Sequence, residues 1–164
     1  MPGNMLGVNR LPSPERLASM NLVYHPDRFD HAQLAEEVLQ ANPVLYTKIT
    51  AACEIEEFHV PQSLTEVIRF LNLIAVSETV LTPSKFLDHV WHEFILCTRA
   101  YWSFCERNFG RMIHHHPGGS EEKNREQFRR TLELYRKHFG APDPCFWECA
   151  ALPAASDCGG CEAD

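Results

Sequence analysis

The residues best suited to chemistry lie in a stretch from position 88 to 119, which holds five of the nine histidines and two of the seven cysteines. Asp88 and His92 are four residues apart, so on a helix the carboxylate can orient the imidazole, as carboxylates do for metal-bound histidines. His114 and His115 form a second group. Imidazoles and a carboxylate suit Zn²⁺, Fe²⁺ or Mn²⁺. Histidines that cap helix ends or fill polar gaps are the alternative interpretation, and both stay open at this point.

Cysteines near the end of the chain form a second candidate group, Cys145, Cys149, Cys158 and Cys161. Four thiolates this close in sequence can complete a tetrahedral zinc site, and the glycines of "CGGC" permit the tight turn between the last two. The first pair has three intervening residues instead of the usual two. A redox-sensitive or metal-scavenging tail, and a tail without function, therefore remain alternatives.

Length and composition indicate a single soluble domain. The chain has 164 residues, 45% hydrophobic and 23% charged, and no apolar run reaches the ~18 to 20 residues of a membrane span. The first residues lack the apolar core of a secretory signal, so we expect a cytoplasmic protein whose cysteines are free or metal-bound. A formal net charge of -7 disfavours nucleic acid as a partner, and no membrane association is expected.

Helix signals without alternating strands predict an all-α fold, a compact bundle of about five to six helices. Asp30 with Gln33 opens a helix to about Ala41. Further helix starts are indicated by Pro43, by Ser63 with Glu66, and by Thr82 as an N-cap with Pro83. Gly110 indicates a helix end. A last helix is indicated from its cap Ser120 through Phe139, and it stops at Gly140. We expect a flexible N-terminal segment at 1–20, a single helical domain at 21–149 and a mobile Cys/Gly tail at 150–164.

The central helical segment carries one apolar stripe. At about 100° per residue, one face collects Leu87, Val90, Trp91, Phe94, Thr98, Tyr101 and Cys105. This is the core face, so most of the aromatic residues are interpreted as structural, and Cys105 as a small buried side chain. Asp88 and His92 lie on the flank of the stripe.

Motifs along this segment carry a family resemblance. The pattern runs from Asp88-x-x-Trp91-His92 through Thr98, Tyr101 and Phe104-Cys105 to Phe109-Gly110 and His114-His115-x-Pro117. Over roughly residues 64–149 it resembles the glycine-rich domain-containing protein-like family of plants and bacteria, as a bacterial single-domain member. The resemblance implies a site shared by the Trp-His and His-His-x-Pro motifs, with His114 and His115 preferred to His116. The tail departs from that family, because "DCGGCEAD" replaces longer glycine-cysteine runs.

A common site requires a break in the central helix. In one straight helix over residues 84–109, His92 would lie about 25 Å from the helix end, whereas residues 110–114 span at most about 17 Å. Plant sequences of the family that the chain resembles carry proline near the position of Thr98, which implies a boundary there. Thr98 is also an acceptable N-cap. We therefore predict a break near Thr98 that lets the histidine run fold back toward Asp88.

The sequence thus predicts a metal site of Asp88, His92, His114 and His115, with zinc preferred and iron or manganese as alternatives. The cysteine group above is a candidate second site. The competing hypothesis is a non-enzymatic protein-protein interaction module whose histidines and tryptophans are structural. No phosphate-binding loop, nucleophile elbow or HExxH motif assigns a reaction, and the sequence leaves the oligomeric state open.

Overall fold

The computed structural model describes residues 23–148 and, as backbone, residues 158–163. The elements in chain order are η1 (Pro26–Arg28), α2 (His31–Ala41), α3 (Val44–Cys53), η2 (Glu57–His59), α4 (Val60–Val76), α5 (Lys85–Leu96), α6 (Thr98–Phe109), β1 (Ile113–Pro117), α7 (Glu121–Phe139), α8 (Pro144–Trp147) and β2 (Cys158–Ala163). The predicted all-α class is confirmed. The expected flexible segment at 1–20 and most of the expected mobile tail lie outside the described residues.

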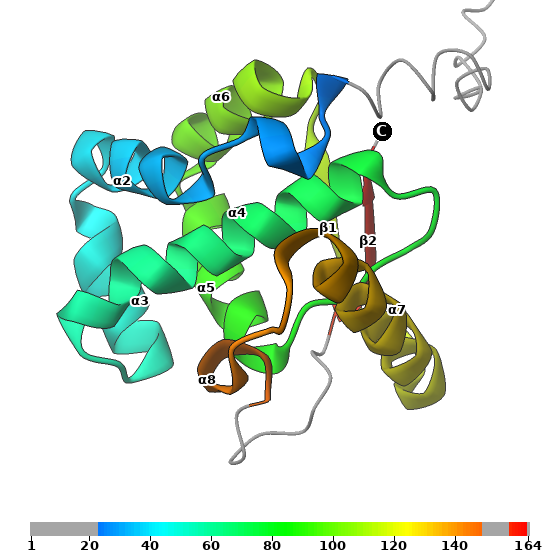
Figure 1. The fold of residues 1–164 in the computed structure, drawn as a ribbon. Coiled ribbons are helices and arrows are strands. Elements are labelled where there is room, and N and C mark those ends of the chain that lie inside the picture. Colours follow the sequence, from blue (N-terminus) through cyan, green and yellow to red (C-terminus); the bar gives the residue numbers. More distant parts are fainter. Residues whose placement is uncertain (1–22, 149–157, 164) are drawn as a thin grey trace, which may run out of the picture.

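Helix α4 is the central element of the fold. Most of its residues are apolar, and both its ends and its middle are buried, including Leu64, Phe70 and Leu73 at 0% exposure. A helix that is apolar on nearly every side must be covered all round. Figure 1 shows α4 crossing the middle of the molecule, with α2 and α3 on its left and α7 on its right. Helix α5 also packs on α4, so α4 is the support on which the candidate site is built.

Two of the predicted helix starts are confirmed. The carboxylate of Asp30 accepts a hydrogen bond from the backbone N–H of Gln33 and caps α2, which ends at Ala41 as predicted. Ser120 caps α7 in the same way through the N–H of Lys123. In both cases a short polar side chain satisfies one of the free N–H groups at the helix start.

Two other predicted caps are wrong. Helix α4 begins at Val60, so Ser63 lies inside the helix and its hydroxyl donates to the carbonyl of His59. Ser84, rather than Thr82, caps α5. Thr82 instead donates its backbone N–H to the Thr131 hydroxyl oxygen and its own hydroxyl to the side-chain carbonyl of Gln127. These contacts fasten the loop before α5 to α7, a long-range role that a local capping pattern does not reveal.

The predicted break in the central helix is confirmed. Helix α5 ends at Leu96 and α6 begins at Thr98, with Cys97 between them at φ -81° and ψ 58°, outside helical geometry. Cys97 serves as the cap of both helices, so Thr98 is not the N-cap that was proposed for it. The change of direction at Cys97 also removes Thr98 from the buried stripe and leaves it exposed.

A short two-stranded antiparallel ribbon joins the helices. Strand β1 pairs with β2, and the ladder sets His115 opposite Cys161 and His114 opposite Glu162, with an irregularity between His116 and Pro117. Neither strand was predicted from the sequence. Among the helices of the described residues, none combines the length and the apolar character needed to cross a membrane.

Candidate metal centre

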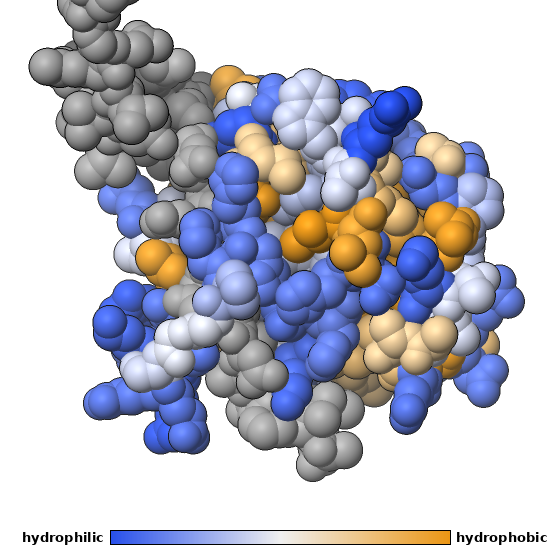
Figure 2. All heavy atoms as spheres, turned by 180° about the vertical axis from the view of Figure 1, so that it is seen from behind, coloured by the Kyte–Doolittle hydropathy of each residue, from blue (hydrophilic) through white to orange (hydrophobic). Residues whose placement is uncertain are grey.

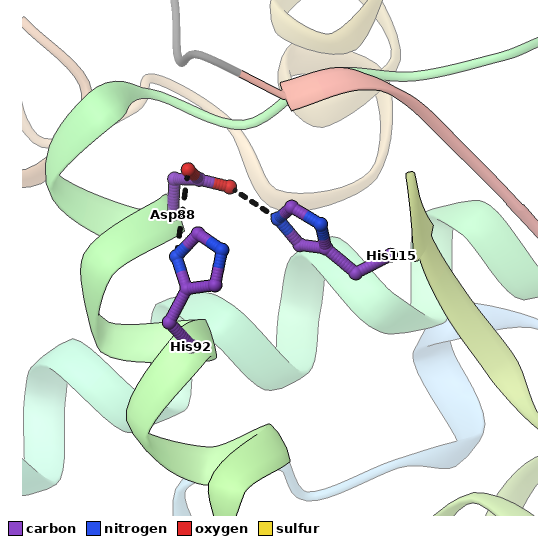
Figure 3. Close-up of side chains that lie close together, drawn as sticks. All are labelled: Asp88, His92 and His115. Carbon is purple, nitrogen blue, oxygen red and sulfur yellow. Dashed lines mark hydrogen bonds and ion pairs between the residues drawn. The ribbon is translucent and has the colours of Figure 1, made fainter. Parts of the chain in front are cut away.

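The candidate site is centred on the carboxylate of Asp88, whose side chain is 5% exposed. Its Oδ1 lies 2.8 Å from Nε2 of His115, and its Oδ2 lies 3.6 Å from Nδ1 of His92. One potential ligand atom from each residue falls within 4.8 Å of the other two. Figure 3 shows both rings turned toward the carboxylate, His92 from the same helix and His115 from β1. The three side chains therefore form one compact group of an oxygen and two nitrogens.

Helix α5 places two members of the group. Asp88 and His92 are four residues apart, the spacing that stacks side chains on one helix face. The first turn of α5 is fixed by Ser84, which accepts from the N–H of Leu87 at 3.1 Å and donates to the carbonyl of Phe146 at 2.6 Å. Helix α8 thus holds the start of α5, and with it the position of Asp88.

Strand β1 brings in the third member. Gly110 ends α6 at φ +66°, a left-handed conformation that favours glycine, and a Cβ atom there would lie 2.5 Å from the Tyr24 hydroxyl. After the turn, Ile113 is buried at 0% exposure and His114 is exposed. Because strand side chains alternate between two faces, His115 returns to the inner side with Ile113.

A buried hydrogen-bond relay fixes β1 against the helices. The indole N–H of Trp91 donates to the Tyr101 hydroxyl at 3.1 Å, and that hydroxyl donates to the carbonyl of Ile113 at 2.7 Å. Both aromatic side chains are almost fully buried. The relay joins α5, α6 and the start of β1 two residues before His115. The predicted core role of Trp91 and Tyr101 therefore includes positioning the site.

Aromatic rings enclose His115. Its ring centroid is 4.7 Å from that of Trp91 and 4.4 Å from that of His92. The His115 side chain is 8% exposed, whereas the His92 side chain is 45% exposed. The site is therefore closed on the Trp91 side and open to solvent at His92.

The buried carboxylate of Asp88 is paired with two histidines. Within the part of the chain that the structure describes, its ion-pair partners are two imidazoles, with no lysine or arginine. A buried charge without a compensating partner is costly. A cation bound between the three side chains would compensate the charge of the carboxylate directly.

Three of the four predicted ligands meet here, and the fourth does not. Asp88, His92 and His115 converge, whereas His114 lies on the exposed face of β1, 6.5 Å from the ring of His116. Sequence could not choose between the adjacent histidines, because the choice depends on which face of a strand is buried. The signal was the apolar Ile113, two residues from His115.

The four cysteines of the candidate second site are only partly described. Cys145 is exposed in α8, and Cys149 lies outside the described residues. Cys158 and Cys161 are placed in β2 as backbone positions. Cys105, in contrast, is fully buried, and burial raises the pKa of its thiol, so it is unsuited to act as a nucleophile or ligand.

A polar cluster elsewhere in the core was missed by the sequence analysis. Glu66, interpreted as part of a capping box, is 2% exposed and accepts hydrogen bonds from Tyr135 at 2.6 Å, Trp147 at 2.9 Å and Arg69 at 2.8 Å. Burial, followed by the neighbouring Glu66 carboxylate, raises the pKa of Tyr135. The cluster ties α7 and α8 to α4. An acidic residue within an apolar helix stripe, with arginine three positions later, was its only local signal.

A comparison with known protein families identifies the family of the chain. A family model described as UCP032817-like matches residues 32–138, well over half of the chain, and the match includes Asp88, His92 and His115. The chain belongs to the UCP032817-like family. The resemblance to the glycine-rich domain-containing protein-like family is therefore wrong as an assignment, since the match is to a different family. The family name specifies no activity, ligand or partner. No curated protein and no solved structure matches the chain.

Proposed function

We propose that this protein binds a divalent transition metal, with zinc preferred, through Asp88, His92 and His115. The observation that carries the proposal is the convergence of one ligand atom from each residue within 4.8 Å. Two imidazoles and one carboxylate are a common ligand set for zinc, iron and manganese. Three ligands also leave a position for water, substrate or a further protein group.

The spacing of the three ligand atoms is within side-chain reach of that in a loaded site. In tetrahedral zinc coordination with bonds of about 2.0–2.1 Å, neighbouring ligand atoms lie about 3.3 Å apart. The oxygens of Asp88 are 2.8 Å from His115 and 3.6 Å from His92. These distances involve different oxygens, and one ligand atom from each of the three residues lies within 4.8 Å of the others, so side-chain movements of up to about 1.5 Å would bring all three to that spacing. Metal binding therefore requires no rearrangement of the helices.

Preorganisation of the two buried ligands supports the same function. Asp88 is held by the capped first turn of α5, and His115 is held by the relay from Trp91 through Tyr101. Residues that orient metal ligands in this way raise affinity, because less conformational freedom is lost on binding. The exposed ring of His92 provides the route by which an ion enters.

The proposal is tested by titrating zinc into untagged, metal-free protein in a calorimeter. We expect one equivalent to bind, and His92→Ala and His115→Ala each to weaken binding by at least about tenfold, a loss typical even of residues that only support a ligand. His114→Ala is the matched control on the opposite face of β1 and keeps wild-type affinity. Equal affinity of wild-type protein and His115→Ala contradicts the proposed site.

The competing function is a non-enzymatic interaction module in which the Asp88-His115 hydrogen bond is purely structural. Two apolar side chains beside the helix break favour it, Leu96 at 65% and Trp102 at 56% exposure. Figure 2 also shows apolar side chains gathered in a band across one face of the molecule. An interaction module purifies without metal and retains its partner in the His92→Ala variant, but loses it when Leu96 and Trp102 become polar.

A further inference from the structure

A groove between α2, α3 and the first half of α4 lies outside the candidate metal centre. Its volume is about 480 Å³, within the range of about 300–1,000 Å³ of small-molecule sites. Figure 1 shows α2 and α3 beside this half of α4. Residues of all three helices line the groove, among them Gln62, Glu66, Arg69, Ala32, Glu36 and Tyr46. The three residues of α4 are three or four positions apart, so they form a polar wall on one helix face.

The guanidinium of Arg69 has one occupied side and one free edge. Its Nη1 donates to the Glu66 carboxylate at 2.8 Å and to the Tyr135 hydroxyl at 3.1 Å. Its Nε is buried without a hydrogen-bond partner, and no contact within the described residues engages Nη2. A buried donor without an acceptor costs free energy. Nε and Nη2 together form an edge that binds a carboxylate through two parallel hydrogen bonds, so this edge is suited to a ligand carboxylate.

The structure holds the guanidinium in place before any ligand binds. Its central carbon lies 5.4 Å from the centroid of the Phe139 ring, and the two hydrogen bonds of Nη1 fix its orientation. A guanidinium fixed in this way loses little conformational freedom on binding. The Arg69 side chain is 34% exposed, which leaves it within reach of a ligand in the groove.

The charges that line the groove indicate the class of ligand. Among the described residues of the lining, Arg69 is the one cation, whereas Glu36 and Glu66 contribute carboxylates. Glu66 pairs with Arg69, and the exposed Glu36 forms no ion pair in the described part of the chain. A phosphate or a dicarboxylate would bring a second negative charge near Glu36, and like charges repel. A ligand with one carboxylate and one ammonium group matches both residues.

We propose that this groove binds a free α-amino acid, with its carboxylate on the free edge of Arg69 and its ammonium group on the side of Glu36. The amide of Gln62 and the hydroxyl of Tyr46 offer donors and acceptors to the rest of the ligand. This inference goes beyond the proposed function and does not depend on it, because none of these residues belongs to the metal centre.

Calorimetric titration of the full-length protein with each common amino acid tests this inference. We expect at least one to bind at one equivalent and to raise the thermal midpoint of unfolding, since a ligand of the folded state stabilises it. The amide of that amino acid lacks the carboxylate charge, and the hydroxy acid of the same skeleton lacks the ammonium group. Each of these two analogues should bind at least about tenfold more weakly, because a hydrogen bond between charged groups is lost.

Variants of the protein locate the ligand. Arg69→Lys keeps the positive charge but lacks the edge with two parallel donors, so binding should weaken by at least about tenfold. Ala32→Leu fills the groove from an exposed position of α2 and should abolish binding while the core stays packed. Ala41→Leu, the same substitution at another exposed position of α2, is the matched control and keeps wild-type affinity. His115→Ala should also keep it, which separates the groove from binding of an amino acid to a metal ion.

Each contrary result overturns the inference. These results are the absence of amino-acid binding by wild-type protein, equal affinity of wild-type protein and Ala32→Leu, and loss of binding in His115→Ala. An amide or a hydroxy acid that binds as tightly as the amino acid overturns it as well. Far-ultraviolet circular dichroism of the variants, expected to be unchanged, verifies that the helices remain folded.

Discussion

The carboxylate of Asp88 and the ring of His115 are 27 positions apart in the chain and 2.8 Å apart in space. The contact depends on the break at Cys97, on α6 and on the turn at Gly110, which together return the chain to the flank of α5. Helix α5 and strand β1 thereby enclose a polar cluster against the buried indole of Trp91. We propose that this cluster is a metal site.

Replacing Asp88 by asparagine separates a ligand from a structural residue. We expect Asp88→Asn to lower zinc affinity by at least about tenfold. The metal-free variant should keep its free energy of unfolding within about 1 kcal/mol, because the change removes a buried charge and keeps the side-chain shape. Glu93→Gln, the same change in charge on the same helix, is the control. A large loss of stability in metal-free Asp88→Asn, with zinc affinity unaltered, supports the structural alternative.

Removing the Tyr101 hydroxyl tests the relay that positions β1. Tyr101→Phe leaves the Trp91 N–H and the Ile113 carbonyl without this partner. We expect a cost of about 2–3 kcal/mol in urea unfolding, since buried polar groups lose their hydrogen bonds. Zinc affinity should also fall, because His115 follows Ile113 by two residues. Unchanged zinc affinity in a destabilised Tyr101→Phe variant would show that β1 is positioned by other contacts.

The Glu66 cluster should act on stability and not on zinc binding. Tyr135→Phe removes the hydrogen bond to the buried Glu66 carboxylate and the one that the hydroxyl accepts from Arg69, while the carboxylate keeps Trp147 and Arg69. We expect a loss of about 1.5–3 kcal/mol in the free energy of unfolding, the usual range for hydrogen bonds to charged groups. Zinc affinity should be that of wild-type protein. A Tyr135→Phe variant with lowered zinc affinity contradicts the separation of the two clusters.

Acid should destabilise the fold through His31. Burial lowers the pKa of His31, while its hydrogen bond to Asn72 partly opposes the change. Below about pH 6.5 the His31 imidazole therefore binds a proton more readily in the unfolded chain than in the folded chain. The contribution of this group to the free energy of unfolding is present above this pH and is lost as the pH falls below it. His31→Gln should lose less stability than wild-type protein between about pH 7.5 and pH 5.5 in urea unfolding. His138, whose pKa burial also lowers, leaves part of the decline in the variant. Equal declines contradict the role of His31.

The helices were largely predictable because their signals are local. Asp30 and Ser120 sit directly before amphipathic segments, and side-chain caps act within three residues. Glu66 has the same local pattern but a different role, because Tyr135 and Trp147 lie 69 and 81 positions away. Burial against distant residues therefore decided the role of Glu66, and no short pattern contains that information.

The site was predictable in part for the same reason. Asp88 and His92 share a helix turn, so their spacing alone brought them together. His115 required the helix break, which the reach of the chain predicted. The choice of His115 over His114 required β1, and β1 exists as a strand through its pairing with β2. Pairing between segments separated by α7 and α8 leaves no periodic pattern in "HHHP" or "CGGC".

The most direct measurement is elemental analysis of the native protein, purified without a histidine tag and without chelators. We expect about one equivalent of a transition metal per chain, with zinc in excess of iron and manganese, and at least about tenfold less metal in a matched His115→Ala preparation. His114→Ala, purified in parallel, should contain as much metal as wild-type protein. Wild-type protein without a transition metal, or with the same metal content as His115→Ala, contradicts the metal centre.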